Sequence, residues 1–224
     1  MEIKPIAKII TDFPTKFGIP RQSGLVEKLT GEIIFEPEFQ NPNYIRGIEQ
    51  FSNLWLIWGF SENEDKEKGA TVRPPMLGGN VRLGVFATRS PFRPNNLGLS
   101  CVKLEDIISD EKGLRLRVSG CDMMNGTPIY DIKPYIPYSD SVPEAKGGFA
   151  EKKKDYRLNV EADKELLSAL PESKRELLLE VLACDPRPQY QEDEKRIYGF
   201  GFAGFEIKFR VENNTVILET IEKI

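Results

Sequence analysis

The chain has 224 residues, of which 40% are hydrophobic, and its formal net charge is −4. This length suffices for one large domain or for a domain with a smaller companion, and the negative charge excludes a protein that coats nucleic acid by bulk attraction. The chain contains no histidine, which excludes Ser-His-Asp and Cys-His catalytic sites and every metal site built on histidine.

The three cysteines, Cys101, Cys121 and Cys184, are too few and too scattered for a disulfide framework. Residues 1–10 alternate apolar and polar side chains and lack the continuous apolar core of a secretion signal. The longest apolar run, residues 54–60, is far shorter than the ~20 residues that a membrane-spanning helix needs. We therefore expect a soluble cytoplasmic protein with reduced thiols and no bound metal.

Short apolar segments bounded by Gly, Pro, Asn and Asp dominate the first 138 residues and are typical of strands. Their spacing predicts a mainly β fold with a single-sheet barrel. One helix is predicted at residues 43–51, with Asn43 as its N-cap, and Trp55 and Trp58 are expected in the core. The predicted strands are residues 3–10, 31–36, 54–60, 81–88, 97–108, 114–118 and 127–136.

The composition changes near residue 140. Residues 139–155 combine proline, glycines and a lysine run with few core-forming side chains, as in a linker. Two helices and three strands are predicted beyond it. The helices span 162–170 and 171–183, and the strands span 197–202, 205–211 and 216–221, with turns at 203–204 and 213–214. The sequence thus predicts a β-barrel domain over residues 1–140, a linker over 141–160 and a small α+β domain over 161–224.

A predicted strand stops within residues 84–100, in a loop with two arginines, two prolines and two asparagines. Pro91 and Pro94 restrict the backbone around Arg89 and Arg93, and residues 71–103 carry five basic side chains and no acidic one. A rigid guanidinium pair suits a planar or phosphate-bearing ligand. The alternative is an arginine-rich loop that only solvates one end of a sheet, and such a loop has no need of rigidity.

Two further segments are candidates for chemistry. Asp131 and Lys133 lie two residues apart on one predicted strand, so their side chains share one face of the sheet. Either this carboxylate and ammonium serve the chemistry of the site, or they form an exposed ion pair with no such role. Residues 185–190 (DPRPQY) present Arg187 between two prolines and place Tyr190 where it could stack on a base. The alternative for this second segment is a linker that ends a helix.

The segment GVFATRSPFRPNNLGLS at residues 84–100 closely resembles the signature of the TsaA-like (TrmO) proteins, methyltransferases that use S-adenosylmethionine to methylate tRNA. The resemblance implies methylation of N6 of threonylcarbamoyladenosine beside the anticodon, contact with the tRNA anticodon loop, and a homodimer. It extends along nearly the whole chain through the blocks PRQSGL at 20–25, FSNLWLI at 51–57, TVRPP at 71–75, DMMNGTPIYDIKPY at 122–135 and DPRPQY at 185–190.

The resemblance also implies which residues surround the methyl donor. Asn125 stands where the family usually has an aspartate, so we move the expected charged partner of the sulfonium to Asp122. Ser23 replaces a usual proline, and Asn53 and Ser61 stand where histidines are common. The residues expected to bind the cofactor are Gln22, Ser23, Gly24, Ser61, Arg89, Leu99, Asp122, Asn125, Gly126 and Thr127.

The expected reaction needs help with a proton, because N6 of threonylcarbamoyladenosine is a urea-type nitrogen of low nucleophilicity. In the absence of histidine, we expect Asp131 to act as the base or to orient the nitrogen. Lys133 or Arg89 then offsets the negative charge that develops on the urea oxygen. The residues expected to contact tRNA are Arg73, Arg82, Arg93, Asn95, Asp185, Arg187 and Tyr190.

Two other functions remain open. Asn125 leaves room for a non-catalytic RNA-binding protein on the same fold, and binding of S-adenosylmethionine in the absence of RNA would exclude it. A barrel enzyme that binds another nucleotide would hold phosphates with residues 89–93. In that case phosphate-bearing ligands would raise the melting temperature more than the methyl donor does.

Overall fold

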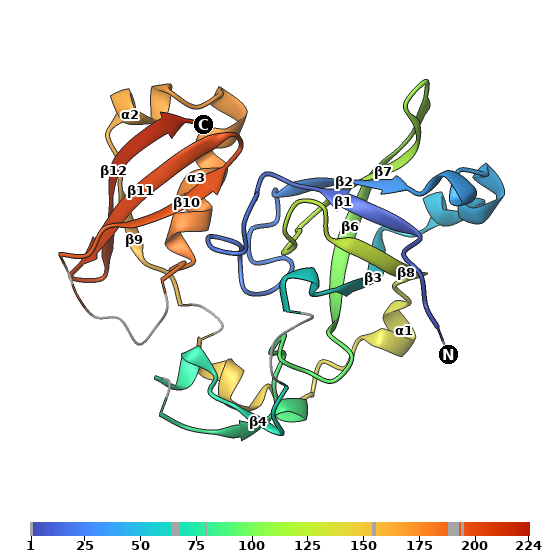
Figure 1. The fold of residues 1–224 in the computed structure, drawn as a ribbon, viewed down its shortest axis with the longest axis horizontal. Coiled ribbons are helices and arrows are strands. Elements are labelled where there is room, and N and C mark those ends of the chain that lie inside the picture. The colour runs from blue at the N-terminus through green and yellow to red at the C-terminus, as the bar shows by residue number, and fades with distance from the viewer. Residues whose placement is uncertain (1, 64–67, 79, 154–155, 188–192, 194) are drawn as a thin grey trace.

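The computed structural model describes residues 2–63, 68–78, 80–153, 156–187, 193 and 195–224 (Figure 1). A closed barrel and a smaller sheet covered by helices lie side by side, with the C-terminus in the smaller unit. The expected mainly β fold, with a barrel followed by a small α+β unit, is confirmed. Among the helices formed by these residues, none has the length and hydrophobicity needed to span a bilayer.

Six antiparallel strands close the barrel in the order β1-β2-β7-β6-β3-β8. Closure satisfies both edges of the sheet, because β8 pairs with β1 as well as with β3. Alternate residues point inward, and Leu54, Leu56 and Trp58 of β3 are buried. The strands are β1 (Ala7–Ile10), β2 (Thr30–Phe35), β3 (Asn53–Gly59), β6 (Leu97–Asp110), β7 (Gly113–Ser119) and β8 (Pro128–Pro134).

Alternation along β3 also shows where a core prediction is wrong. Trp58 is buried, but Trp55 lies on the outer face, only partly buried. There its ring packs 5.8 Å from that of Tyr135 and its Nε1 donates to Asp140, 3.0 Å away. A β-carbon on Gly98 would lie 2.3 Å from the Trp58 ring, so a residue without a side chain is needed opposite this indole.

Two predicted elements outside the barrel are also wrong. Residues 81–88 form no barrel strand; β5 (Leu83–Gly84) pairs only with β4 (Thr71–Val72), and a 3-10 turn follows at Val85–Ala87. The helix expected at 43–51 is instead two 3-10 turns, Pro42–Ile45 and Ile48–Gln50, and Asn41 caps the first. Gly47, at φ 90°, separates the turns because a left-handed residue cannot continue a helix.

The C-terminal unit is a four-stranded sheet of order β10-β11-β12-β9. Its last three strands and their turns are confirmed, with Ala203 and Asn213 in left-handed conformation. The sequence missed β9, at the end of the segment interpreted as a linker, which pairs in parallel with β12. The elements are α1 (Pro137–Asp140), β9 (Asn159–Glu161), α2 (Lys164–Ser168), α3 (Glu172–Ala183), β10 (Tyr198–Phe202), β11 (Phe205–Glu212) and β12 (Thr215–Lys223).

The loop of residues 11–29, between β1 and β2, belongs to both units. Its side chains Phe13, Val26 and Leu29 are buried in the core of the C-terminal unit, where Phe13 packs 5.4 Å from Phe202. Lys174 of α3 pairs with a carboxylate of this loop, 2.5 Å away. The loop is therefore held from two sides, which fixes its central residues at the end of the barrel.

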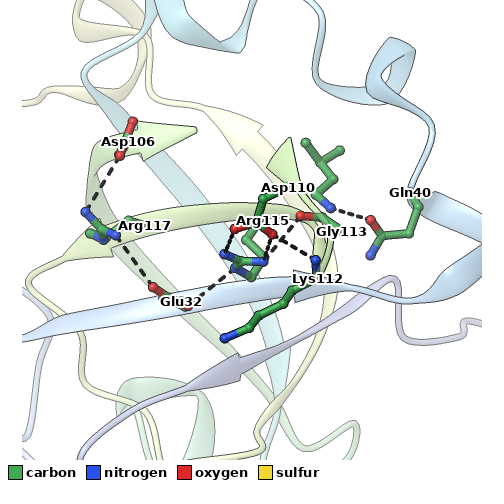
Figure 2. Close-up of polar contacts among 9 residues, drawn as sticks. Glu32, Gln40, Asp106, Asp110, Lys112, Gly113, Arg115 and Arg117 are labelled. Atoms are coloured by element: carbon green, nitrogen blue, oxygen red, sulfur yellow. Dashed lines mark hydrogen bonds and ion pairs between the residues drawn. The ribbon is translucent and has the colours of Figure 1, made fainter. Parts of the chain in front are cut away.

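The hairpin that joins β6 to β7 is closed by an ionic network (Figure 2). Arg115, nearly buried, makes two hydrogen bonds to Asp110 at 2.8 and 2.9 Å and an ion pair with Glu32 at 3.5 Å. Arg117 bridges Glu32 and Asp106. Hydrogen bonds from Arg115 lower the pKa of Asp110 from 3.8 to about 2. This network secures the end of the barrel opposite the loops described next.

Candidate active site

Three loops meet at one end of the barrel. Because all neighbouring strands are antiparallel, β1, β3 and β7 end where β2, β6 and β8 begin. The connecting segments at that end are residues 11–29, 60–96 and 120–127. They carry all the residues expected around the methyl donor except Leu99, although these residues come from distant parts of the sequence.

A directed chain of hydrogen bonds runs from the barrel interior to this end. Trp58 Nε1 donates to Ser100 Oγ at 2.9 Å, and Ser100 Oγ donates to Asp122 Oδ1 at 2.6 Å. The backbone N–H of Ser23 also donates to the Asp122 carboxyl. Gly24 N donates to the carbonyl of Gly120 at 3.0 Å. The loops of residues 11–29 and 120–127 are therefore joined around one carboxyl group.

The surroundings of Asp122 leave its charge poorly solvated. Burial raises the pKa of this carboxyl to about 6, against the lowering effects of the Ser100 hydrogen bond, the Ser23 backbone and the nearby Arg89 charge. Arg89 in turn donates a hydrogen bond to Gln22 Oε1. The result is a carboxylate that is ionised at neutral pH, beside an exposed guanidinium, and it is suited to a ligand that carries both charges.

The loop of residues 84–100 is rigid for more reasons than its prolines. Thr88 Oγ1 donates to the Val85 carbonyl at 2.8 Å, and Arg93 Nη1 donates to the Thr88 carbonyl at 3.1 Å. Phe92 N donates to Ser90 Oγ at 3.2 Å. Arg93 thus stabilises the loop from within, and its contact with RNA stays a prediction.

The turn at residues 125–127 explains the asparagine that departs from the family pattern. Asn125 Oδ1 accepts a hydrogen bond from Thr11 N at 3.2 Å, and Asn125 N donates to the Phe13 carbonyl at 2.8 Å. Gly126, at φ 81°, donates its N–H to the carbonyl of Ile9. The amide oxygen of Asn125 therefore caps the start of the 11–29 loop without a charge.

Asp131 and Lys133 form the expected ion pair, 2.8 Å apart and largely exposed. They lie on the outer wall of the barrel, where Asp131 is opposite Ile57 and Leu99 flanks Ile57 from the other side. Asp131 also accepts the N–H of the next residue. This pair therefore belongs to a different face from the Asp122 network, and the expected grouping of Asp131 with Arg89 is not formed by these contacts.

A cleft of about 250 Å³ opens beside the ends of β3 and β6. Phe60, Leu97 and Tyr130 contribute apolar walls, and Asn95 and Asn96 contribute amides. Asn96 Oδ1 is buried and accepts no hydrogen bond, while its Nδ2 donates to the Asn63 carbonyl. Apolar walls with an exposed amide at Asn95 suit a flat heterocycle.

The residues expected to contact tRNA have different surroundings. Three of them, Arg73, Arg82 and Asn95, are exposed, and Arg82 donates a hydrogen bond to Thr71 Oγ1. Arg187 is only 15% exposed and pairs with the buried Asp185 at 2.8 Å. Ser61, expected at the cofactor, is exposed in a 3-10 turn after β3. Tyr190 lies outside the described residues.

The sequence missed two members of the site, Trp58 and Ser100. Trp58 was interpreted only as core. Ser100 is the last residue of the 84–100 segment, and its place in that segment was the one feature of the sequence that pointed to a role in the site. Its partner Asp122 lies 22 residues away, and no sequence periodicity links the two.

Comparisons with known proteins cover both units. The family model "tRNA-methyltransferase O N-terminal domain" matches residues 8–141, and "TrmO C-terminal domain" matches residues 155–224. The tRNA (adenine(37)-N6)-methyltransferase of Escherichia coli K12 is 37% identical over 219 residues, covering 94% of this chain and 93% of that protein. The corresponding enzyme of Eikenella corrodens is 42% identical over 171 residues, which cover 76% of this chain and 97% of that protein.

Solved structures give the same result. A crystal structure of TrmO matches with a TM-score of 0.79 and 32% identity, over 99% of both chains. TrmO from Pseudomonas aeruginosa matches with a TM-score of 0.80 and 30% identity, over 100% of this chain and 97% of that one. Because family models, full-length relatives and whole-chain structural likeness agree, this chain belongs to the tRNA-methyltransferase O family.

Proposed function

We propose that this protein is an S-adenosylmethionine-dependent tRNA (adenine(37)-N6)-methyltransferase and that its substrate nucleoside is N6-threonylcarbamoyladenosine. Relatives with the first of these activities in their names align over nearly their full length. The observation that carries the proposal is the desolvated Asp122 carboxylate beside Arg89 at the loop-bearing end of the barrel. A zwitterion with an additional cation is complementary to such a site.

The residues present fit S-adenosylmethionine. Asp122 would face the sulfonium, and Arg89 with the backbone of residues 22–24 would hold the amino-acid carboxylate. The cleft lined by Phe60, Tyr130 and the amide of Asn95 suits the adenine ring. The bound cofactor supplies an electrophilic methyl group.

Asp131 and Lys133 would serve the substrate. Asp131 is exposed on the outer wall, whereas Asp122 is desolvated, and carboxylates in such different surroundings suit different tasks. We assign to Asp131 the removal of the N6 proton. Lys133, 2.8 Å away, holds that carboxylate in place and offsets negative charge on the urea oxygen.

Two assays test this function. Calorimetry with S-adenosylmethionine alone should show binding without RNA, whereas a non-catalytic RNA-binding protein would show none. Mass spectrometry of nucleosides from tRNA incubated with the protein and the donor should show one added methyl group on threonylcarbamoyladenosine. Methylation of tRNA that lacks the threonylcarbamoyl group at an equal rate would contradict the assigned substrate.

Asp131→Asn tests the assigned base. We expect kcat to fall by about 10²- to 10⁴-fold, the usual contribution of a positioned base. The affinity for S-adenosylmethionine should change less than about twofold. Glu38→Gln is a matched control, because Glu38 forms an equally short and exposed ion pair with Lys4. Unchanged turnover in Asp131→Asn would remove this residue from the mechanism.

We also propose that the protein is a homodimer in which the outer wall near Leu99 is covered by a second copy. Leu99 is 53% exposed, and Phe86 of the neighbouring loop is 79% exposed. Large apolar side chains left exposed to water are typical of an interaction surface. Leu99→Lys should therefore yield a monomer by sedimentation velocity, while Ile197→Lys, at an exposed apolar residue of the C-terminal unit, should leave a dimer. A wild-type monomer would contradict this proposal.

A further inference from the structure

We propose that Ser100 and Trp58 are positioning residues, which hold the carboxylate of Asp122 toward the methyl donor through a one-way chain of hydrogen bonds. This inference rests on the proposed function for its ligand, but not for its geometry. Ser100 contacts Asp122 directly, and Trp58 acts on Asp122 through Ser100.

The direction of the chain follows from the chemistry of the groups. An indole Nε1–H is a donor only, so Trp58 must donate to Ser100 Oγ. The serine hydroxyl has a single hydrogen, and that hydrogen then points at Asp122 Oδ1, 2.6 Å away. A hydroxyl that donates in this way favours the ionised carboxylate over the acid. An ionised carboxylate can only accept, so the Ser100 hydroxyl donates to Asp122 while Trp58 donates to Ser100.

The position of Ser100 argues that this bond has a purpose beyond packing. Ser100 is 1% exposed and points into the barrel from β6, opposite Leu56 and two residues from the buried Val102. An apolar interior does not favour a hydroxyl, and alanine would fill the same place without a polar group. Gly98 on the same strand makes room for the Trp58 ring. The two strands are therefore shaped to bring an indole and a hydroxyl to one carboxylate.

Other charged groups around Asp122 act on it less directly. Arg89 favours the ionised form from across the loop, and the buried thiol of Cys121, whose own pKa is raised mainly by burial, stays neutral. The backbone N–H groups of Ser23 and of Asp122 itself are the other hydrogen-bond donors. Removing the Ser100 hydroxyl therefore leaves these influences in place and isolates the contribution of a single bond.

The test follows the carboxyl carbon of Asp122 by NMR over pH 4 to 9, with Asp122→Asn for assignment. We expect a midpoint near pH 6 in the wild type and about one pH unit higher in Ser100→Ala, with recovery in Ser100→Thr. Trp58→Phe should shift the midpoint in the same direction by less. Ser119→Ala is the matched control, since Ser119 of β7 likewise donates its hydroxyl to a carboxylate, that of Glu105 on β6.

Binding supplies a second readout. A one-unit shift lowers the ionised fraction at pH 6 about fivefold, so Ser100→Ala should bind S-adenosylmethionine about fivefold more weakly at pH 6 and within twofold of the wild type at pH 8. An Asp122 midpoint that is the same in Ser100→Ala and the wild type overturns the inference; if Ser100→Ala does not fold, Trp58→Phe decides. Absence of donor binding in the wild type would instead refute the proposed function.

Discussion

Replacing Asp122 with asparagine should weaken the binding of S-adenosylmethionine by at least about 30-fold at pH 8. The reason is the loss of a desolvated negative charge beside a cationic sulfonium, an interaction of about 2 kcal/mol. Calorimetry on the wild type and Asp122→Asn measures this difference directly. Asparagine retains the size of the side chain and can still accept the Ser100 hydrogen, so packing changes little.

The dependence on pH is the sharper part of this prediction. A cation prefers the ionised carboxylate, so the wild type should bind more tightly as the pH rises through about 6 and up to tenfold more weakly per unit below it. Asp122→Asn does not titrate here, and its affinity should be constant from pH 5 to 8. A wild-type affinity that is equally flat would show that Asp122 does not meet the cation.

The same substitution should stabilise the fold. The pKa of Asp122 is raised from 3.8 to about 6 in the folded protein, so its ionised form opposes folding, and this penalty grows between those two values. Asp122→Asn should therefore be more stable than the wild type by about 3 kcal/mol above pH 6 and nearly equally stable at pH 4. Urea unfolding at pH 8 and pH 4 measures both differences. A gain in stability with a loss of binding is the expected signature of a functional residue.

The second large effect concerns the junction between the two units. Asp185→Ala should reduce the free energy of unfolding by about 3–5 kcal/mol, because it leaves a mostly buried guanidinium without its partner. Asp185 is buried at φ 53° and binds Arg187 through both carboxyl oxygens, while Tyr156 Oη donates to it at 3.2 Å. Arg21 of the shared loop donates to the carbonyls of Asp185 and Arg187.

Two companions make this prediction specific. Asp185→Asn keeps a residue that tolerates left-handed backbone and retains part of the hydrogen bonding, so it should lose less stability than Asp185→Ala. Lys28→Ala removes an exposed ion pair with Glu176 that joins the same two units, and should change stability by less than about 1 kcal/mol. Urea unfolding of the three variants gives the comparison. Equal losses for Asp185→Ala and Lys28→Ala would show that the buried cluster adds nothing.

Some of the fold and the site follows from local pattern. Apolar segments between turn residues were enough to predict the barrel strands, because each strand buries one face and solvates the other. The two-residue period placed Asp131 and Lys133 together, and they do pair. Turn residues located the bends at 203–204 and 213–214, where left-handed backbone is needed.

Local pattern misled where a segment lies outside the barrel. Residues 81–88 are as apolar as a strand, but no free strand remains in the closed sheet for them to pair with, so they form a short ribbon and a turn. Arg93 lies in a loop whose composition is typical of a ligand-binding segment, but its guanidinium donates to the carbonyl of Thr88 in the same loop.

The sequence by itself determined the barrel class, the rigid arginine loop, the two-residue carboxylate–ammonium pair and the resemblance to a methyltransferase family. Only the tertiary structure decided that Trp58 meets Ser100, 42 residues away, that Ser100 meets Asp122, and that Asn125 caps a loop 114 residues away. The physical reason is closure of the barrel. Strand pairing brings distant loops to one end of the sheet, and no period within a single segment encodes which residues meet there.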